Sequence, residues 1–201
     1  MNNERFRTFI ARMTGLVSST TDEQRLHAEG RELLADIVRH DDWLPEPCAQ
    51  PHPQYYQQYL LHCDPLERFS VVSFVWGPGQ KTPVHNHTVW GILGVMRGAE
   101  VCNRFDAPTP GQAMRMHPQE KLNLHEIDIV SPTVGDIHRV ENAYADRTSI
   151  SIHVYGANIG AVKRHVFDPA TGKRKDFISG YSNSAVPNFW DRSAEVRATL
   201  Q

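Results

Sequence analysis

The stretch GQKTPVHNHTVWGILGVMRG, Gly79–Gly98, places two histidines one residue apart directly before an apolar run. If residues 84–92 form a β-strand or lead into one, His85 and His87 project from the same face, because strand side chains alternate. Their Cα atoms would be about 6.6 Å apart, and both imidazoles could reach one ion at a nitrogen–metal distance of about 2.1 Å. Because such pairs also occur by chance on surfaces, this pattern predicts a metal site only if further ligands join it.

The sequence around this stretch is typical of an antiparallel β-barrel or sandwich. From about Arg68, short runs rich in β-branched and aromatic residues are separated by Gly, Pro, Asn and Asp, unlike the alternating strands and helices of a parallel sheet. The runs are FSVVSFVWG, HTVWGILGVMRG, AEVCNRF, HEIDIV, TSISIHVYG and HVFDPATG. We therefore expect a β-barrel over about residues 68–180.

The first forty residues have a different, helical pattern. Apolar residues recur at helical spacing in two segments, at Phe6, Phe9, Ile10, Met13 and Val17, and at Leu26, Leu33, Leu34, Ile37 and Val38. Thr20 and Glu23 fit a capping box at the start of the second helix. We expect residues 1–45 to be a helical region that packs on the barrel, and residues 1–201 to form a single domain.

The composition excludes several classes of protein. Hydrophobic residues make up 40% of the chain and charged residues 22%, with a net charge of −2. No basic block suggests a nucleic-acid or membrane-surface partner. Three widely spaced cysteines indicate a reducing compartment rather than a disulfide framework. Without a signal-peptide pattern or a membrane-length apolar run, we expect a cytoplasmic protein, with its oligomeric state left open.

The segment SPTVGDIHRVEN, Ser131–Asn142, adds a third histidine after a Pro and Gly turn. Pairing between strands could bring His138 beside the HxH pair. Three neutral imidazoles leave the charge of a divalent metal uncompensated and keep coordination positions open. A zinc ion with a bound water would make this a hydrolytic or hydration site, whereas a ferrous ion could bind substrate and O₂ together. The number of ligands does not decide between them.

The stretch TSISIHVYGANIG carries an alternating polar row. Ser151, His153 and Tyr155 would share one face of a strand, with apolar residues on the other face. Such alternation usually marks a strand that is half exposed to solvent, but in a barrel that holds three histidines the polar face can point inward. The row lacks a carboxylate and a nucleophile elbow, so it does not resemble a hydrolase triad.

These motifs resemble those of cupins. The first cupin motif matches at Gly79, His85, His87 and Gly98, and the second, with one extra residue, at Pro132, Gly135, His138 and Asn142. Gly91 stands where the first motif has a glutamate, so the usual carboxylate ligand is missing. The resemblance implies a mainly β fold, a cupin jelly-roll barrel with an N-terminal helical region.

The HxH pair without a glutamate, the later histidine and the SxHxY row together resemble the cysteine dioxygenase family of thiol dioxygenases. The resemblance runs from the Tyr-rich segment PQYYQQYLLH (residues 53–62) to about Phe177. The resemblance implies Fe(II) held by His85, His87 and His138. It also implies that both atoms of O₂ pass to the sulfur of a small thiol, giving a sulfinic acid. Tyr155 would hydrogen-bond the oxygen or the substrate, and His153 and Ser151 would orient it.

Two departures from animal-type members bear on the substrate. Those members have a cysteine shortly after the HxH pair, cross-linked to the tyrosine; HTVWGIL has none, and Cys102 lies too far along, so Tyr155 should be unmodified. They also bind the substrate carboxylate with an arginine on an early strand, which YYQQYLLH lacks. Arg164 could bind a carboxylate bidentately instead, if it rather than Lys163 points inward. This pattern resembles the bacterial 3-mercaptopropionate dioxygenase branch, so the substrate is expected to be cysteine or 3-mercaptopropionate.

Two other classes of function stay open. One is another metal-dependent cupin enzyme, such as an isomerase or a zinc hydrolase. Metal analysis and a test for a thiol requirement would distinguish it from a thiol dioxygenase. The other is a non-catalytic cupin that binds a small molecule. The intact SxHxY row argues against the second class, because a binding module has no need of the tyrosine.

Overall fold

The computed structural model describes residues 3–184 and 193–200. Two helices, α1 (Asn3–Ser19) and α2 (Glu23–Val38), come first, followed by the 3₁₀ turn η1 (Glu46–Cys48). The strands are β1 (Gln57–Cys63), β2 (Ser70–Trp76), β3 (Val84–His85), β4 (Gly91–Arg97), β5 (Glu100–Arg104), β6 (Glu120–Leu122), β7 (Ile127–Val130), β8 (His138–Asn142), β9 (Ser149–Tyr155), β10 (Arg164–Phe167) and β11 (Arg174–Phe177). The turn η2 (Ile159–Ala161) lies between β9 and β10, and a short helix, α3 (Ser193–Arg197), lies near the C-terminus.

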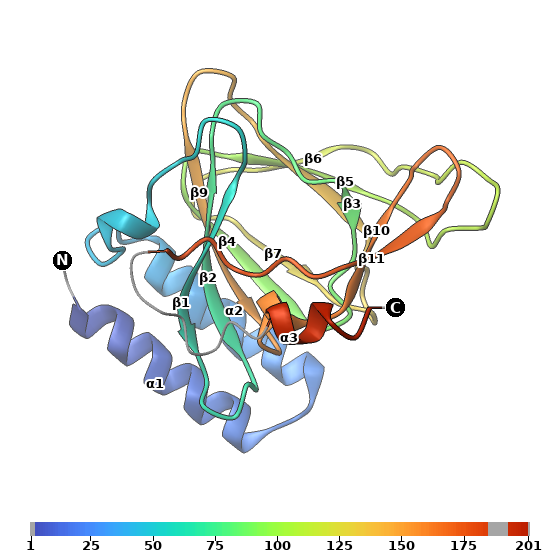
Figure 1. The fold of residues 1–201 in the computed structure, drawn as a ribbon. Coiled ribbons are helices and arrows are strands. Elements are labelled where there is room, and N and C mark those ends of the chain that lie inside the picture. Colours follow the sequence, from blue (N-terminus) through green and yellow to red (C-terminus); the bar gives the residue numbers. More distant parts are fainter. Residues whose placement is uncertain (1–2, 185–192, 201) are drawn as a thin grey trace.

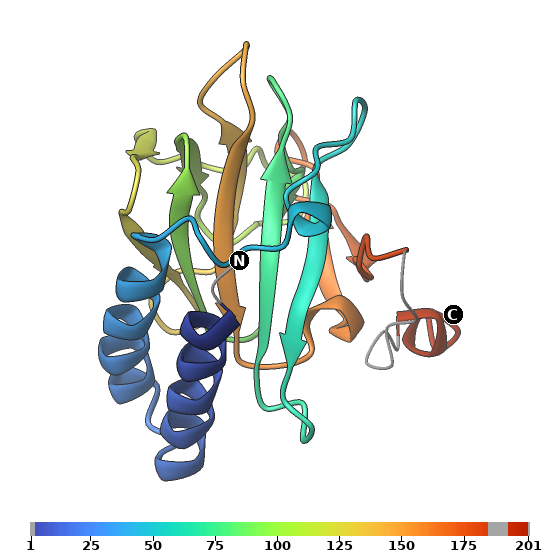
Figure 2. The same ribbon diagram turned by 90° about the vertical axis from the view of Figure 1, so that its left-hand side faces the viewer.

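The strands form two antiparallel sheets that face each other as a barrel (Figure 1). One has the order β1-β2-β9-β4-β7 and the other the order β11-β10-β3-β8-β5-β6. Helices α1 and α2 lie against the outer face of the first sheet (Figure 2). The expected fold, a mainly β cupin jelly-roll barrel with an N-terminal helical region, is confirmed, and the Tyr-rich segment contributes strand β1.

Strand β9 lies in the middle of the five-stranded sheet, and all seven of its residues are buried. Ile152 and Val154 belong to the apolar core that the sheet shares with the helices, which includes Leu34 and Val38 of α2. Because side chains alternate along a strand, the neighbouring polar residues face the barrel interior. The helices therefore cover one face of this sheet and leave the opposite face to line the site.

The structure corrects one local prediction and decides between the alternatives of another. The N-cap of α2 is Asp22, whose side chain accepts a hydrogen bond from the backbone N–H of Gln24 at 3.1 Å, so the capping box at Thr20 and Glu23 is wrong. Glu23 instead accepts a hydrogen bond from the Ser131 hydroxyl. Of the two alternatives for residues 84–92, the structure has the segment that leads into a strand, because β3 ends at His85 and β4 begins only at Gly91.

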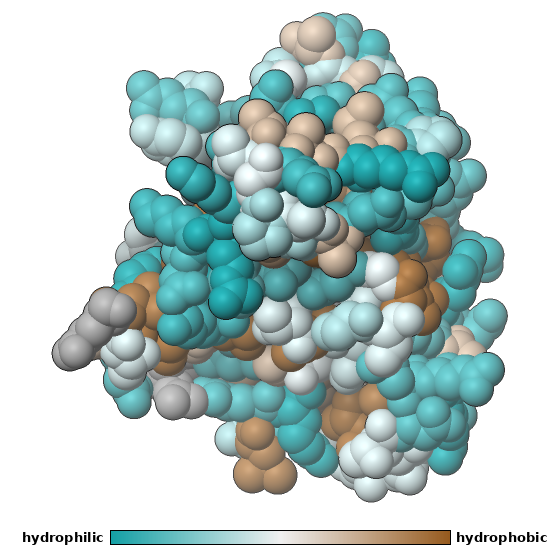
Figure 3. Space-filling view, turned by 90° about the vertical axis from the view of Figure 1, so that its right-hand side faces the viewer, coloured by the Kyte–Doolittle hydropathy of each residue, from teal (hydrophilic) through white to brown (hydrophobic). Residues whose placement is uncertain are grey.

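Figure 3 shows the face of the molecule on the side of β10 and β11. On that face, hydrophobic residues appear as separate groups among hydrophilic ones (Figure 3). Within residues 3–184 and 193–200, no helix has both the length and the apolar character needed to cross a bilayer. The single-domain organisation over residues 1–201 stays a prediction.

Candidate metal centre

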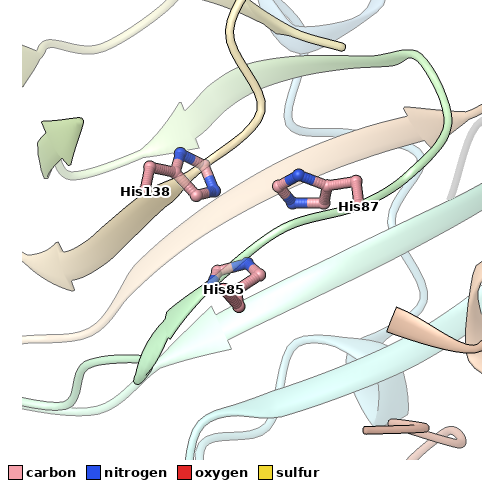
Figure 4. A group of neighbouring side chains, drawn as sticks. All are labelled: His85, His87 and His138. Atoms are coloured by element: carbon pink, nitrogen blue, oxygen red, sulfur yellow. The ribbon is translucent and has the colours of Figure 1, made fainter. Parts of the chain in front are cut away.

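Three histidines from two segments converge inside the barrel (Figure 4). His85 ends β3, His87 follows two residues later, and His138 begins β8, where it pairs with His85 across the strands. Each pair of ring centroids is 4.9 Å apart, and one nitrogen of each ring lies within 4.8 Å of the others. All three side chains are buried. The structure thus brings together the three predicted ligands.

Each imidazole contacts another group of the protein through its Nδ1 atom. These atoms contact the carbonyl of Pro83 at 3.0 Å (His85), a carboxylate oxygen of Asp136 at 2.9 Å (His87) and the sulfur of Cys102 at 3.4 Å (His138). The first two partners accept a hydrogen bond from Nδ1–H, which leaves Nε2 as the nitrogen with a free lone pair. Nε2 of His87 is buried and has no hydrogen-bond partner among the described residues. Since an unpartnered buried nitrogen is costly, this arrangement fits a bound metal ion.

Asp136 is a residue of the site that the sequence analysis missed. Besides His87 Nδ1, its carboxylate accepts hydrogen bonds from the backbone N–H groups of His87 and Thr88, each at 2.9 Å. Thr88 adopts a positive φ of 62°, as the chain turns after β3. Asp136 therefore holds the predicted ligand His87 in place, although His87 lies beyond the end of strand β3. Its position two residues before His138 was the available signal.

Burial keeps the three histidines neutral at physiological pH. It lowers the pKa of His85 to about 4, and the pKa values of His87 and His138 fall well below their usual range. The positive charge of Arg164 lowers the pKa values of His85 and His87 further. Because a metal ion binds the neutral imidazole, these ligands need not lose a proton before binding one.

Gly91 explains why the site has no carboxylate ligand. It pairs with Tyr155 across β4 and β9, and a Cβ atom at Gly91 would lie 2.8 Å from the Tyr155 ring. The ring occupies the space that a glutamate side chain would need. Tyr155 also stacks on His87, with ring centroids 5.4 Å apart and an interplanar angle of 19°. The phenol thus lies beside the three histidines.

The polar residues of β9 form a continuous hydrogen-bonded row inside the barrel. The Ser151 hydroxyl lies 2.7 Å from Nε2 of His153, and Nδ1 of His153 lies 2.8 Å from the Tyr155 hydroxyl. The indole N–H of Trp76 donates to Ser151 Oγ at 3.2 Å. Burial lowers the pKa of His153 to about 3 and raises that of Tyr155, so both are neutral near pH 7. The solvent-exposed alternative for this strand is therefore wrong.

Arg164 is buried in the barrel with 3% of its surface exposed. Its Nη2 donates to the Ser179 hydroxyl at 2.7 Å, and its Nε has no hydrogen-bond partner among the described residues. Lys163 points outward and pairs with Asp176 at 2.9 Å, which settles which of the two faces inward. None of the ion pairs found in the described part of the chain neutralises Arg164. A buried guanidinium without an anionic partner is suited to binding an anion.

Comparisons with known proteins agree with this geometry. Residues 55–168 match the family model "Cysteine dioxygenase type I". The chain belongs to the cysteine dioxygenase family.

Among curated relatives, cysteine dioxygenase type 1 of Danio rerio is 25% identical over 131 residues, covering 64% of this chain and 60% of the relative. The Homo sapiens protein of the same name is 26% identical over 133 residues, covering 64% of this chain and 65% of the relative. The chain thus spans less than two thirds of the length of these relatives. A protein from Klebsiella pneumoniae with a double-stranded β-helix domain is 14% identical at a TM-score of 0.45, covering 68% of this chain and 97% of that one.

Within this cysteine dioxygenase fold, Cys102 contacts a predicted metal ligand. Its sulfur faces His138 Nδ1 from strand β5, whereas Tyr155 lies on β9. Burial raises the pKa of the Cys102 thiol to about 12, so it is protonated. The prediction that Tyr155 carries no cross-link stays a prediction.

Glu100 is a second residue that the sequence analysis missed, and it corrects the statement that the polar row lacks a carboxylate. It lies on β5 with 3% of its surface exposed. Burial raises its pKa to about 7, while hydrogen bonding with Ser151 and Trp76 acts in the opposite direction. The signal was the alternation in AEVCNRF, which puts Glu100 and Cys102 on the same face of β5, and both are buried.

Proposed function

We propose that this member of the cysteine dioxygenase family is a non-heme Fe(II) thiol dioxygenase. It would add both atoms of O₂ to the sulfur of a small carboxylate thiol and give a sulfinic acid. The observation that carries this proposal is the convergence of three neutral, buried imidazoles beside a buried Arg164 that has no anionic partner among the described residues. A thiolate with a carboxylate would complement both positive centres, the proposed Fe(II) ion and the guanidinium of Arg164.

His85, His87 and His138 would hold the iron through Nε2, since their Nδ1 atoms already contact the protein. An Fe(II) ion on these ligands would supply the redox chemistry for reaction with O₂, together with open coordination positions. The three neutral ligands leave the positive charge of the metal uncompensated. The site therefore favours a substrate whose sulfur is bound as a thiolate.

Arg164 would bind and orient the substrate carboxylate. Ser179 holds the guanidinium at Nη2, and Nε is buried and unpartnered, so a carboxylate could complete its hydrogen bonds. Holding the far end of the substrate in this way reduces its freedom to move relative to the reacting sulfur. Lys163, which is half exposed and paired with Asp176, would not contribute.

Tyr155 would hydrogen-bond to the reacting groups through its hydroxyl. Burial keeps this phenol protonated, and its ring lies against His87. His153 holds the hydroxyl from the other side, and Ser151 holds His153, so the phenol is oriented before the substrate arrives. Such preorganised hydrogen bonding is worth most in a buried site that excludes water.

The electrostatics of the site favour 3-mercaptopropionate over cysteine. Both have a carboxylate and a thiol, but cysteine also carries an ammonium group. The charge of Arg164 already lowers the pKa values of His85 and His87, so a second cation in this field would be destabilised. A substrate without the ammonium group avoids that cost.

The experiment that tests this proposal is O₂ consumption by anaerobically Fe(II)-loaded protein. Cysteine and 3-mercaptopropionate are offered in parallel, the sulfinate products are quantified, and metal-free protein is the control. We expect stoichiometric O₂ uptake and sulfinate formation, with the higher kcat/KM for 3-mercaptopropionate. Absence of uptake with both thiols, in protein shown to contain iron, would overturn the proposal.

A further inference from the structure

A buried carboxyl group ends the hydrogen-bonded row that begins at the metal centre. The row runs from the Tyr155 hydroxyl through His153 to Ser151, at 2.8 and 2.7 Å. Beyond Ser151 lies Glu100, which comes from the opposite sheet and interacts with Ser151 and Trp76. Its Oε1 atom is buried and has no hydrogen-bond partner among the described residues. Neither the metal centre nor the Arg164 site accounts for an acid in this position.

The row can carry its hydrogen bonds in either of two directions. His153 is neutral and has one N–H, so it donates to one neighbour and accepts from the other. If Glu100 is ionised, Ser151 donates to it, His153 donates to Ser151, and Tyr155 donates to His153. The Tyr155 oxygen then presents only lone pairs to the centre.

If Glu100 is protonated, every one of these hydrogen bonds reverses. The carboxyl donates to Ser151, Ser151 donates to Nε2 of His153, and Nδ1–H of His153 donates to the Tyr155 oxygen. The Tyr155 O–H is then free to donate toward the three histidines. The indole N–H of Trp76 can donate to Ser151 Oγ in both arrangements, and its hydrogen bonding with Glu100 favours the one with the ionised carboxyl.

We infer that Glu100 is the terminal proton acceptor of this row, and that its protonation state decides whether Tyr155 offers the centre a proton or a lone pair. Glu100 does not touch the substrate; it is a positioning residue that acts through Ser151 and His153. The inference rests on the proposed thiol oxidation for its chemical purpose.

The proton transfer balances without any oxidant. The S–H bond of the thiol breaks as the Tyr155 oxygen takes its proton, and the Tyr155 proton passes to Nδ1 of His153. The Nε2 proton of His153 passes to Ser151, and the Ser151 proton forms an O–H bond on Glu100. The negative charge moves from the carboxylate to the sulfur, where the positive charge of Arg164 stabilises it.

The groups around Glu100 suit a carboxyl that changes state near neutral pH. Asp128 on β7 and Cys102 on β5 lie within its electrostatic reach, as does Tyr155 on β9. Cys102 and Tyr155 are uncharged near pH 7, and the charge of Asp128 is partly offset by its ion pair with Arg104. Ser151 and Trp76 supply the hydrogen bonding that favours the carboxylate.

Infrared spectroscopy of the full-length, metal-free chain tests the inference independently of turnover. We expect a protonated-carboxyl band that disappears with a midpoint near pH 7 in the parent and is absent in Glu100→Gln. Glu141→Gln is the matched control; Glu141 lies on β8 and is only half-buried, so this change should leave the band unchanged. A parent without a band that titrates near neutral pH, or a band that persists in Glu100→Gln, would overturn the inference.

A second variant tests the connection to the row. Ser151→Ala removes the hydroxyl that favours the ionised carboxyl, so the midpoint of the Glu100 band should move to higher pH. An unchanged midpoint would mean that Glu100 is not coupled to the row.

The pH profile of kcat/KM then links the row to turnover. The change of kcat/KM near pH 7 should be absent in Glu100→Gln and present in Glu141→Gln. If it is also present in Glu100→Gln, the result would count against proton transfer along the row to Glu100. If the iron-loaded parent oxidises no thiol, the proposed function fails, and the infrared titrations still decide the state and the connection of Glu100.

Discussion

The two faces of the five-stranded sheet are both buried but have opposite chemistry. On the outer face, Ile152 and Val154 pack with the helices in a core of apolar side chains. On the inner face, alternate residues of the same strand are polar, and the interior around them holds unpartnered atoms of His87, Glu100 and Arg164. The outer face is complete as it stands, whereas the unpartnered atoms near the inner face would be completed by the metal ion and substrate proposed to bind there.

The largest expected effect follows from removing a predicted metal ligand inside the barrel. His87→Ala should lower the affinity for Fe(II) by at least about 100-fold, because one of three ligands and its Asp136 contact are lost. Metal analysis after dialysis against a weak chelator measures the loss. His27→Ala, which changes a buried histidine on α2, is the control and should retain iron. Full iron retention in His87→Ala would refute the ligand assignment.

The buried acid Glu100 should make the stability of the protein depend on pH. The folded-state pKa of Glu100 is raised from 4.5 to about 7, so its favourable contribution is complete below pH 4.5 and lost as the pH rises to 7. The parent should therefore lose about 3 kcal/mol of stability over this interval relative to Glu100→Gln. Urea unfolding of both proteins at pH 5, 6, 7 and 8 measures the difference. Parallel stability curves would contradict it.

The guanidinium should affect substrate binding more than folding. Arg164→Ala should raise KM for 3-mercaptopropionate by roughly 10- to 100-fold, the value of a lost charged hydrogen-bonded pair. A thiol without a carboxylate, such as ethanethiol, should be little affected. Lys163→Ala is the matched control on the neighbouring, outward-facing residue. Equal losses for both thiols would indicate structural damage instead of a lost carboxylate contact.

The smallest expected effect concerns the outer face. Ile152→Val should lower the free energy of unfolding by about 1 kcal/mol, because it removes one buried methyl group from a packed core. Iron content and KM should match the parent, since the side chain points to the helices. Thermal unfolding and steady-state kinetics check the two statements. A changed KM would show that the faces are not independent.

The sequence predicts those parts of the site that depend on spacing along the chain. His85, His87 and His138 lie in recognisable motifs, and the alternation in β9 indicates which of its residues share a face. The length of β3 could not be predicted, because Asp136, from a segment about fifty residues later, holds His87 in place after the strand has ended. That contact depends on which loops the barrel brings together.

Glu100 escaped prediction for a related reason. In the sequence it is an ordinary charged residue at the start of a strand, and such residues are usually exposed. Only the pairing of the strands into a closed barrel places it inside, near Ser151 of the opposite sheet. Arg164 is an intermediate case, because its inward direction depends on a register that the sequence left open between it and Lys163.

Gly91 constrains how this site could change into that of an ordinary cupin. A side chain at this position collides with the Tyr155 ring, with Cβ only 2.8 Å away, so a glutamate cannot be added while the tyrosine remains. Replacing the tyrosine alone removes the phenol and supplies no fourth ligand. The three-histidine and four-ligand sites are thus separated by a double substitution whose single steps are each unfavourable, and the effects of the two changes should be strongly non-additive.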